Sequence, residues 1–411
     1  MRWRSTPTVV VACLLALSAG GAALVLAGNG HPLATAATAA GVASEPASPT
    51  PPPPPPELRV DGKQPNASGQ VQQIDWDAPL AVTLRNATLS IVQVTGPDGR
   101  LAGQFTGDGW TAASTLLPLA AYDLRAAGVT PAGQDITLSA QIMTVPADRV
   151  VHATITPGDG EVVGVGEPVV IYLDHRMRTI AQRRELQARL SVRSVPAVTG
   201  AWHWVSQTEV HYRPETYWPA GAHVTTLANF TRLHLSGTRT WGSGRHSSSY
   251  WIGSSLVSTV DVAAHTMTVR RNGAVLRVLP VSTGRDKYPT KGGVHIVLEK
   301  QADQVFDSST VGIPTASPDG YFEHLPWSVR ISDGGAFVHA NPGTVQFQGV
   351  SNVSHGCVNL SVADAEWYFH LAKRGDIVDV IHAAVGPVLY DPGMTDWNQS
   401  FERWRSTGLI L

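Results

Sequence analysis

The chain has 411 residues, of which 43% are hydrophobic and only 15% are charged, whereas an ordinary soluble domain is roughly 25% charged. The 30 basic residues nearly balance the 32 acidic ones, which argues against a nucleic-acid-binding protein. The 39 glycines, 29 prolines and 12 tryptophans argue against a helical bundle and predict an all-β chain of short strands joined by turns.

The N-terminal residues 1–29 are predicted to be a signal or transmembrane segment. Arg2 and Arg4 precede an apolar run over residues 8–28, which as a helix would just cross a hydrocarbon core of roughly 30 Å. The arginines would stay on the cytoplasmic side, so the rest of the chain is expected to be exported. The sequence leaves open whether this segment anchors the protein in the membrane or is cleaved.

Residues 30–57 are predicted to be a linker. They are rich in Ala, Thr, Ser and Pro, and residues 51–56 are all proline. Consecutive prolines adopt the extended polyproline II conformation, which makes a stiff spacer. We expect this segment to hold the folded part away from the membrane; a disordered tail without a role is the alternative.

Residues 58–150 and residues 151–253 are each predicted to form an immunoglobulin-like β-sandwich. Runs in which apolar and polar residues alternate are separated by Gly and Pro turn signals, the pattern of antiparallel strands. The tryptophans of the second segment are expected in its core, because large aromatics are used mainly for burial. The clearest runs are Leu80, Val82 and Leu84 in the first segment, and residues 169–173, 202–204 and 210–212 in the second.

Residues 254–384 are predicted to form a third, β-rich domain with one main helix. Asn272-Gly273, between two alternating runs, is the strongest short signal for a hairpin. The helix is expected over residues 362–373, with Ser361 as its N-cap and Gly375 as its C-terminal stop. Its buried face is expected to consist of Val362, Ala365, Phe369 and Ala372.

Residues 385–411 are predicted to be a C-terminal extension packed on the third domain. Trp397, Phe401 and Trp404 recur at the i, i+4, i+7 spacing of one helix face. We therefore expect one short helix whose aromatic side chains hold it on the domain surface.

Cys357 is the strongest candidate for a chemical role. It lies in the sequence Ser-His-Gly-Cys-Val-Asn at residues 354–359, directly before the predicted helix. An unpaired thiol in an exported protein is either a buried structural residue or a reactive one. A helix N-terminus stabilises a thiolate, and a nearby imidazole can take its proton, so the surroundings favour a nucleophile.

Two histidines are candidates for the base. His355 lies two residues from Cys357, so both side chains would project to the same face of an extended segment. His339 ends a separate predicted strand and would have to be brought in by the fold. Residue types and spacing do not decide between them. Together the three residues could also hold zinc, but the cysteine lacks a Cys-x-x-Cys partner, so the sequence predicts no metal and no cofactor.

The Val-His pair ending at His339, followed by the motif at residues 354–359, resembles the signature of the YkuD-like L,D-transpeptidase catalytic domain. From Val257 to Arg405, and upstream through the second sandwich, the chain is similar to the actinobacterial form of this family. The resemblance implies two immunoglobulin-like modules, a catalytic β-domain and an aromatic C-terminal extension behind a membrane segment.

The resemblance implies cysteine peptidyl transfer on peptidoglycan. In the family, the cysteine that matches Cys357 attacks the carbonyl between the third residue of a tetrapeptide donor stem and the terminal D-alanine, which leaves. The side-chain amine of an acceptor stem then captures the acyl-enzyme and gives a 3→3 cross-link. His339 matches the family base, and the backbone carbonyl of Ala340 is expected to orient its imidazole.

Further residues of the motif are expected to support this reaction. The backbone N–H groups of Gly356 and Cys357 are the expected oxyanion donors. His355 is expected to shape the site or assist, and Ser354 and Asn359 are expected to hold the loop through hydrogen bonds.

Residues 306–332 match the family's substrate-covering lid. Tyr321 matches a tyrosine that contacts the acyl group and can help polarise the scissile carbonyl. Phe306 stands where a methionine is common, and Val311 where an aromatic can occur; both are expected to face the groove for the stem peptide. Trp327 is expected to be a core residue at the base of the lid.

The expected partners are peptidoglycan stem peptides, as donor and acceptor, and β-lactams of the carbapenem type as covalent inhibitors. No nucleic acid is expected, and the membrane is contacted only through the N-terminal segment. Two alternatives remain: an L,D-carboxypeptidase, in which water replaces the acceptor amine, and a wall-binding scaffold whose catalytic site has decayed.

Overall fold

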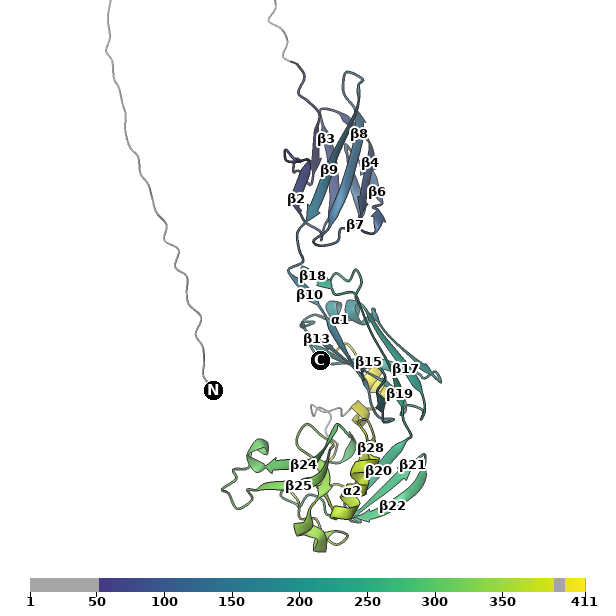
Figure 1. The fold of residues 1–411 in the computed structure, drawn as a ribbon, viewed down its shortest axis with the longest axis vertical. Coiled ribbons are helices and arrows are strands. Elements are labelled where there is room, and N and C mark those ends of the chain that lie inside the picture. The colour runs from purple at the N-terminus through teal and green to yellow at the C-terminus, as the bar shows by residue number, and fades with distance from the viewer. Residues whose placement is uncertain (1–51, 388–395, 411) are drawn as a thin grey trace, which may run out of the picture. The chain divides into compact units, whose positions relative to one another are not determined.

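The computed structural model describes residues 52–387 and 396–410 (Figure 1). The predicted membrane segment, residues 1–29, and most of the predicted linker, residues 30–57, lie outside the described residues. Within the described part, none of the helices is both long and apolar enough to span a membrane. Strands dominate these residues, which agrees with the predicted all-β class.

The first β-sandwich has two sheets that share one core. Trp76, Leu80 and Val82 are fully buried between the sheets, so the alternation read from the sequence corresponds to an inward-facing row of side chains. One sheet has the order β1 (Glu57–Val60), β3 (Pro79–Arg85), β7 (Gly109–Thr115), β6 (Gly103–Thr106). The other has the order β2 (Gln70–Ile74), β9 (Asp135–Thr144), β8 (Ala121–Val129), β4 (Thr88–Gly96), β5 (Gly99–Arg100).

The second β-sandwich repeats this plan and adds a helix that the sequence analysis did not predict. The helix α1 (Ile180–Gln187) begins at a capping box in which Thr179 and Gln182 satisfy each other's backbone N–H groups. Trp204 is buried in the core, as expected. One sheet has the order β11 (Ala153–Thr156), β13 (Val169–Leu173), β16 (Glu209–Pro214), β15 (Gly200–Ser206). The other has the order β12 (Val162–Val163), β19 (Arg245–Ile252), β17 (His223–Asn229), β14 (Leu190–Val195). A two-stranded ribbon of β10 (Arg149–Val151) and β18 (Thr240–Gly242) completes the domain.

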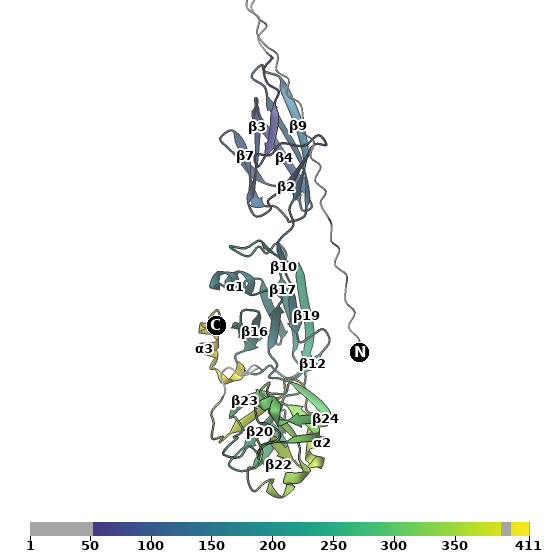
Figure 2. The same cartoon turned by 90° about the vertical axis from the view of Figure 1, so that its left-hand side faces the viewer.

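The third domain consists of two sheets and the helix α2 (Val362–Leu371), which Figure 2 shows from a second side. Asn272 and Gly273 both adopt a positive φ in the hairpin predicted there. The first sheet has the order β22 (Ala274–Pro280), β21 (Thr266–Arg271), β20 (Leu256–Asp261), β28 (Ile377–Ile381), β23 (Gly293–Ile296). The second has the order β24 (Glu299–Asp307), β25 (Phe322–Arg330), β26 (Phe337–Ala340), β27 (Val358–Leu360).

The helix α2 begins where predicted but buries a different face. Ser361 accepts a hydrogen bond from the Asp364 N–H at 3.2 Å, which confirms the N-cap. The buried residues are Ala365 and Tyr368, whereas Val362 is exposed and Phe369 only partly buried. The predicted face was therefore rotated, because the sheets lie under the Ala365–Tyr368–Ala372 edge.

The end of α2 also differs from the prediction. The helix ends at Leu371 with Ala372 as its C-cap, and Gly375 adopts a positive φ only in the following turn.

Trp327 is partly rather than fully buried, and packs on Phe369 of this helix with ring centroids 5.2 Å apart.

The second sandwich and the third domain share buried side chains. Ile296 and Ile377 of the third domain belong to the same core cluster as Val169 and Tyr250 of the second sandwich. Beside this cluster, the buried Glu167 accepts a hydrogen bond from Arg374 Nε at 2.9 Å. Burial raises the pKa of Glu167 to about 7, and the guanidinium opposes this rise.

The C-terminal extension packs mainly on the second sandwich, and the expected placement on the third domain alone is wrong. Instead of one helix, it forms a 3₁₀ turn, η3 (Asp396–Asn398), and a short helix, α3 (Phe401–Ser406). Arg213 on β16 lies under the rings of Trp397, Phe401 and Trp404, at 4.9, 5.5 and 5.1 Å from their centroids. Two parts of the extension also contact the third domain: Val385 accepts the Gly292 N–H at 2.9 Å, and Asn398 of η3 exchanges hydrogen bonds with Val294.

A buried ion pair fixes the start of η3. His211 Nδ1 donates to Asp396 at 2.8 Å, and Nε2 donates to Glu209 at 2.7 Å. Burial opposes a charge on His211, but the two carboxylates outweigh it and raise the pKa of His211 to about 10. The imidazolium therefore carries its charge at neutral pH and ties the C-terminal segment to β16.

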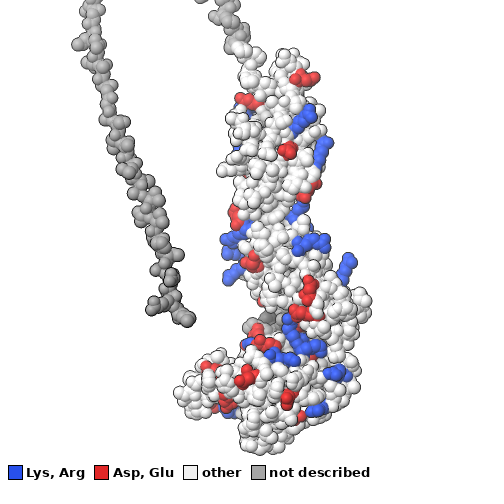
Figure 3. Space-filling model, viewed as in Figure 1, with Lys and Arg blue, Asp and Glu red and all other residues white. Residues whose placement is uncertain are grey.

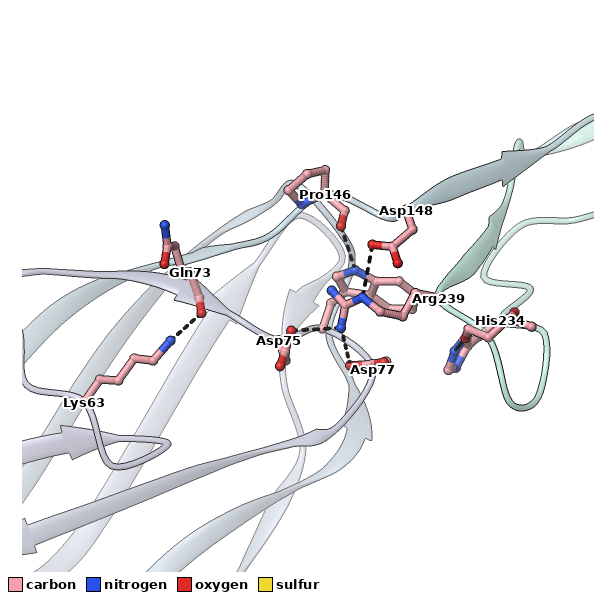
Figure 4. A network of polar contacts seen from close by, with 10 residues as sticks. Lys63, Gln73, Asp75, Asp77, Pro146, Asp148, His234 and Arg239 are labelled. Atoms are coloured by element: carbon pink, nitrogen blue, oxygen red, sulfur yellow. Dashed lines mark hydrogen bonds and ion pairs between the residues drawn. The ribbon is translucent and has the colours of Figure 1, made fainter. Parts of the chain in front are cut away.

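A polar network joins the first sandwich to a turn of the second (Figure 4). Arg239, next to β18, contacts Asp75, Asp77 and Asp148 at 2.9 to 3.2 Å, and its guanidinium lies 5.5 Å from the ring centroid of Trp76. Elsewhere charges are sparse: the face in Figure 3 carries scattered groups of both signs, in keeping with the nearly neutral composition.

Candidate active site

A pocket of about 270 Å³ in the third domain brings together residues that are far apart in the sequence. Its walls come from β24, β25 and the loop between them, from β26 and η2 (Pro342–Phe347), and from β27 and the loop before it. The residues that line it are Phe306, Pro318, Asp319, Gly320, Tyr321, Glu323, Leu325, His339, Asn341, Thr344, Val353, Ser354, His355, Cys357 and Asn359. Both candidate bases and the candidate nucleophile therefore face one cavity.

Parallel pairing of β26 with β27 places these groups. The register pairs Val338 with Val358 and His339 with Asn359. Cys357, one residue before β27, therefore lies next to β26, the strand that carries His339. The Cys357 side chain is half-buried, and its Sγ lies 3.7 Å from the Gly335 carbonyl oxygen.

His339 is held as a neutral imidazole with one orientation. Its Nδ1 lies 2.8 Å from the Ala340 carbonyl oxygen, which can only accept, so Nδ1 carries the proton and Nε2 has a free lone pair. The ring of Phe306 covers it at a centroid distance of 4.8 Å. Burial lowers the pKa of His339 to about 4, and the carbonyl contact opposes this shift.

Cys357 is a neutral thiol in this state, and the expectation of a thiolate stabilised by the helix is wrong. Burial raises the pKa of the Cys357 thiol to about 11, against a smaller opposing effect of a hydrogen bond with the Phe337 backbone. Four residues, the strand β27 and the N-cap Ser361, separate Cys357 from the first residue of α2. The helix dipole acts only near its first turn, so α2 does not ionise the sulfur.

His355 differs from His339 because its outer nitrogen is occupied. Arg285 Nη2 lies 2.9 Å from His355 Nε2, and a guanidinium only donates, so Nε2 accepts and the proton of the neutral ring is on Nδ1. Burial, and then the charge of Arg285, lower the pKa of His355. The ring packs between Tyr288 and Tyr321 at centroid distances of 4.9 and 5.0 Å.

Ser354 closes the loop that carries the cysteine. Its Oγ donates to the Cys357 carbonyl oxygen at 2.7 Å and accepts the Gly356 N–H at 3.1 Å. Thr290 Oγ1 donates to the Gly356 carbonyl at 2.9 Å, and Gly356 has a φ of +116°, which a side chain would strain. The Gly356 N–H, expected as an oxyanion donor, is thus already used by Ser354.

Asn359 and Tyr321 present polar atoms to the pocket. Asn359 is buried and donates through Nδ2 to Thr344 at 3.1 Å, whereas its Oδ1 has no hydrogen-bond partner. Tyr321 is the last residue of the lid, and its backbone N–H donates to Ser308 Oγ at 3.0 Å. Burial, and then the nearby Cys357, raise the pKa of Tyr321, so the phenol is a neutral donor at neutral pH.

The lid differs in one respect from the expectation. It consists of η1 (Ser308–Val311) and the loop that leads to β25. Phe306 lines the pocket as expected, but Val311 is exposed and lies outside it, so the expectation that Val311 faces the groove is wrong. The 3₁₀ turn rotates it toward Gly335 instead.

A charged cluster that residue spacing does not reveal adjoins the pocket at Asp319. Arg285, Lys287 and Tyr288 converge on Asp319 of the lid. Nothing in the local sequence pairs residues this far apart. No group of three or more His, Cys, Asp or Glu side chains within the described ranges is arranged to hold a metal ion.

Two families match the chain in succession. The bacterial Ig domain matches residues 71–234, and the L,D-transpeptidase catalytic domain matches residues 256–380. L,D-transpeptidase 2 of Mycobacterium tuberculosis is 36% identical over 336 residues, which cover 80% of this chain and 80% of that protein. The chain belongs to the L,D-transpeptidase family. The predicted family, the fold class of immunoglobulin-like sandwiches and catalytic domain, and the enzyme class are thereby confirmed.

A second curated relative agrees with this assignment. L,D-transpeptidase 1 of M. tuberculosis is 35% identical over 229 residues, covering 56% of this chain and 84% of that protein. A solved L,D-transpeptidase in complex with imipenem is 33% identical and covers 57% of this chain and 99% of its own, with a TM-score of 0.49.

Proposed function

We propose that this L,D-transpeptidase forms 3→3 cross-links in peptidoglycan through an acyl-enzyme on Cys357 and releases D-alanine from a tetrapeptide donor stem. The observation that carries the proposal is the meeting of a half-buried thiol and an oriented, neutral imidazole in one pocket. A cysteine with a histidine whose tautomer is fixed can act as a nucleophile without a buried acid.

In the first step, Cys357 Sγ attacks the carbonyl of the third stem residue while its proton passes to His339 Nε2. Both groups are neutral beforehand, since the thiol pKa is about 11 and the imidazole pKa about 4. The proton therefore moves as the carbon–sulfur bond forms. When the tetrahedral intermediate collapses, the C–N bond breaks and the imidazolium returns the proton to the departing D-alanine amine.

In the second step, the side-chain amine of an acceptor stem attacks the thioester. His339 takes one proton from the attacking nitrogen, the new C–N bond forms and the C–S bond breaks. The proton then passes to the sulfur, which restores the neutral pair. In the rival L,D-carboxypeptidase reaction, water would take the place of the amine.

The remaining pocket residues stabilise the transition state and position the stem. The Cys357 N–H is the oxyanion donor on which the proposal relies, because the Gly356 N–H is donated to Ser354. Tyr321 contacts the acyl group and donates through its phenol. The buried Asn359 holds its wall of the pocket through the hydrogen bond from its Nδ2 to Thr344.

The same thiol is the proposed site of acylation by carbapenems. The enzyme is proposed to act outside the cytoplasmic membrane, where peptidoglycan lies, with residues 1–29 as its export signal or anchor.

Mass spectrometry of the products formed from a purified tetrapeptide tests this function. We expect cross-linked dimer and free D-alanine from the wild-type chain, and neither from Cys357→Ala. Tripeptide without any dimer would establish the carboxypeptidase reaction instead. A folded wild-type protein that gives no product and is not acylated would support a decayed scaffold and refute the proposal.

A further inference from the structure

Three hydrogen-bond donors from one loop converge on a single carboxylate of the lid. Arg285 Nη2, Lys287 Nζ and Tyr288 Oη all reach Asp319, Lys287 at 2.5 Å and Tyr288 at 3.2 Å. Asp319 lines the pocket that contains Cys357. The hydrogen bond from Lys287, together with the charge of Arg285, lowers the pKa of Asp319, so its carboxylate is ionised at neutral pH.

Arg285 has two contacts besides the one with Asp319. Its guanidinium also donates to His355 Nε2 at 2.9 Å and lies 5.1 Å from the ring centroid of Tyr288. Planar guanidinium groups held in this way are suited to carboxylates, because they offer several N–H donors in a fixed fork. The hydrogen-bond donors of Arg285, Lys287 and Tyr288 therefore surround one carboxylate group, that of Asp319.

The ion pairs with Asp319 are easily exchanged. The Lys287 side chain is 64% exposed and that of Arg285 33% exposed, and pairs open to solvent contribute little to stability. Of this cluster only Asp319 lines the pocket, so a second carboxylate that replaces its side chain there can compete for Arg285, Lys287 and Tyr288 at small cost. The donor stem of the proposed reaction brings two: the C-terminal carboxylate of its D-alanine, next to the scissile bond, and the side-chain carboxylate of its third residue, which in the family is usually diaminopimelate.

Resting on the proposed function, we propose that Arg285, Lys287 and Tyr288 form a carboxylate-binding site for the donor stem, which the Asp319 carboxylate occupies in the free enzyme. A carboxylate of the stem displaces Asp319 when the donor binds. Arg285 thereby selects donors that carry this charge, and its contact with His355 keeps that ring neutral and outside the proton transfer.

The test compares acylation of Cys357, followed by D-alanine or D-alaninamide release, for three donors. One carries both carboxylates, one has a C-terminal carboxamide, and one has its third-residue carboxylate amidated. We expect the wild type to discriminate against one of the two amides by about ten- to one-hundredfold in kcat/KM, as for a lost charged hydrogen bond. Which amide is rejected identifies the carboxylate that is bound.

Arg285→Gln is expected to abolish this discrimination, and Arg285→Lys to restore part of it. The ratio of two rates for one variant does not depend on its folded fraction. The matched control is Arg277→Gln, because Arg277 lies in the same domain but pairs with Asp364 at 3.8 Å and lies 4.3 Å from the ring centroid of Trp367, and should leave the ratio unchanged. Asp319→Asn removes the competing charge and is expected to raise kcat/KM for the full donor severalfold.

Equal rates for all three donors, or discrimination that persists in Arg285→Gln, would overturn the inference but leave the proposed function standing. A loss of activity in Asp319→Asn equal to that in Arg285→Gln would also overturn it, since the cluster would then serve only to hold the lid. If the wild type is acylated by none of the donors, the proposed function fails, and this inference with it.

Discussion

The thiol of Cys357 should react slowly with alkylating reagents for a cysteine that borders an open pocket. With a pKa of about 11, a fraction of about 10⁻⁴ is thiolate at pH 7, whereas an ordinary cysteine of pKa about 8.5 is about 3% thiolate. Since the thiolate is the nucleophile, we expect alkylation by iodoacetamide several hundredfold slower than that of the unfolded chain at the same pH. The rate should rise about tenfold per pH unit from 7 to 10 without reaching a plateau.

Intact-protein mass spectrometry over time measures this rate, in a Cys13→Ala chain so that Cys357 is the single thiol. The matched variant is His339→Gln. A neutral imidazole does not ionise the thiol, so this substitution should leave alkylation nearly unchanged while it abolishes peptide turnover. Fast alkylation with a plateau near pH 6 to 7, lost in His339→Gln, would show a resting thiolate–imidazolium pair and refute proton transfer during attack.

Four further outcomes are expected. His339→Ala should lower the acylation rate at least about 10²-fold. His355→Ala should lower it much less, because Nε2 of His355 is occupied by a guanidinium in the wild type. The reverse order of the two rates would exchange the roles of the two histidines. Phe306→Ala should uncover the base, raise its pKa above about 4, and move the acid limb of the kcat/KM profile to higher pH. Trp404→Ala should lower the free energy of unfolding by about 3 to 5 kcal/mol in urea titrations, since a fully buried indole leaves a cavity. The pKa of His211 in the folded chain lies above its ordinary value, so the stabilisation of the fold by the imidazolium is complete below pH 6.5 and is lost as pH rises toward about 10. The thermal stability of His211→Gln should lack this dependence on pH.

Local signals in the sequence predicted the elements that depend on neighbouring residues. The Asn272-Gly273 hairpin follows from backbone conformations that few other residues adopt, and the N-cap at Ser361 follows from one hydrogen bond within a single turn. The face of α2 was predicted wrongly, because which side of a helix is buried depends on the sheet beneath it. Trp397, Phe401 and Trp404 were recognised as an anchor, but their partner Arg213 lies in another domain.

The sequence by itself determined that this is an all-β enzyme of the L,D-transpeptidase family and that Cys357, His339 and His355 are its candidate reactive groups. The tertiary structure alone decided their protonation states. Burial under Phe306 and the Ala340 carbonyl make His339 a neutral acceptor, whereas Arg285, seventy residues away from His355 in the sequence, occupies that ring. Desolvation and hydrogen-bond direction depend on atoms brought together by folding, and residue spacing carries no information about them.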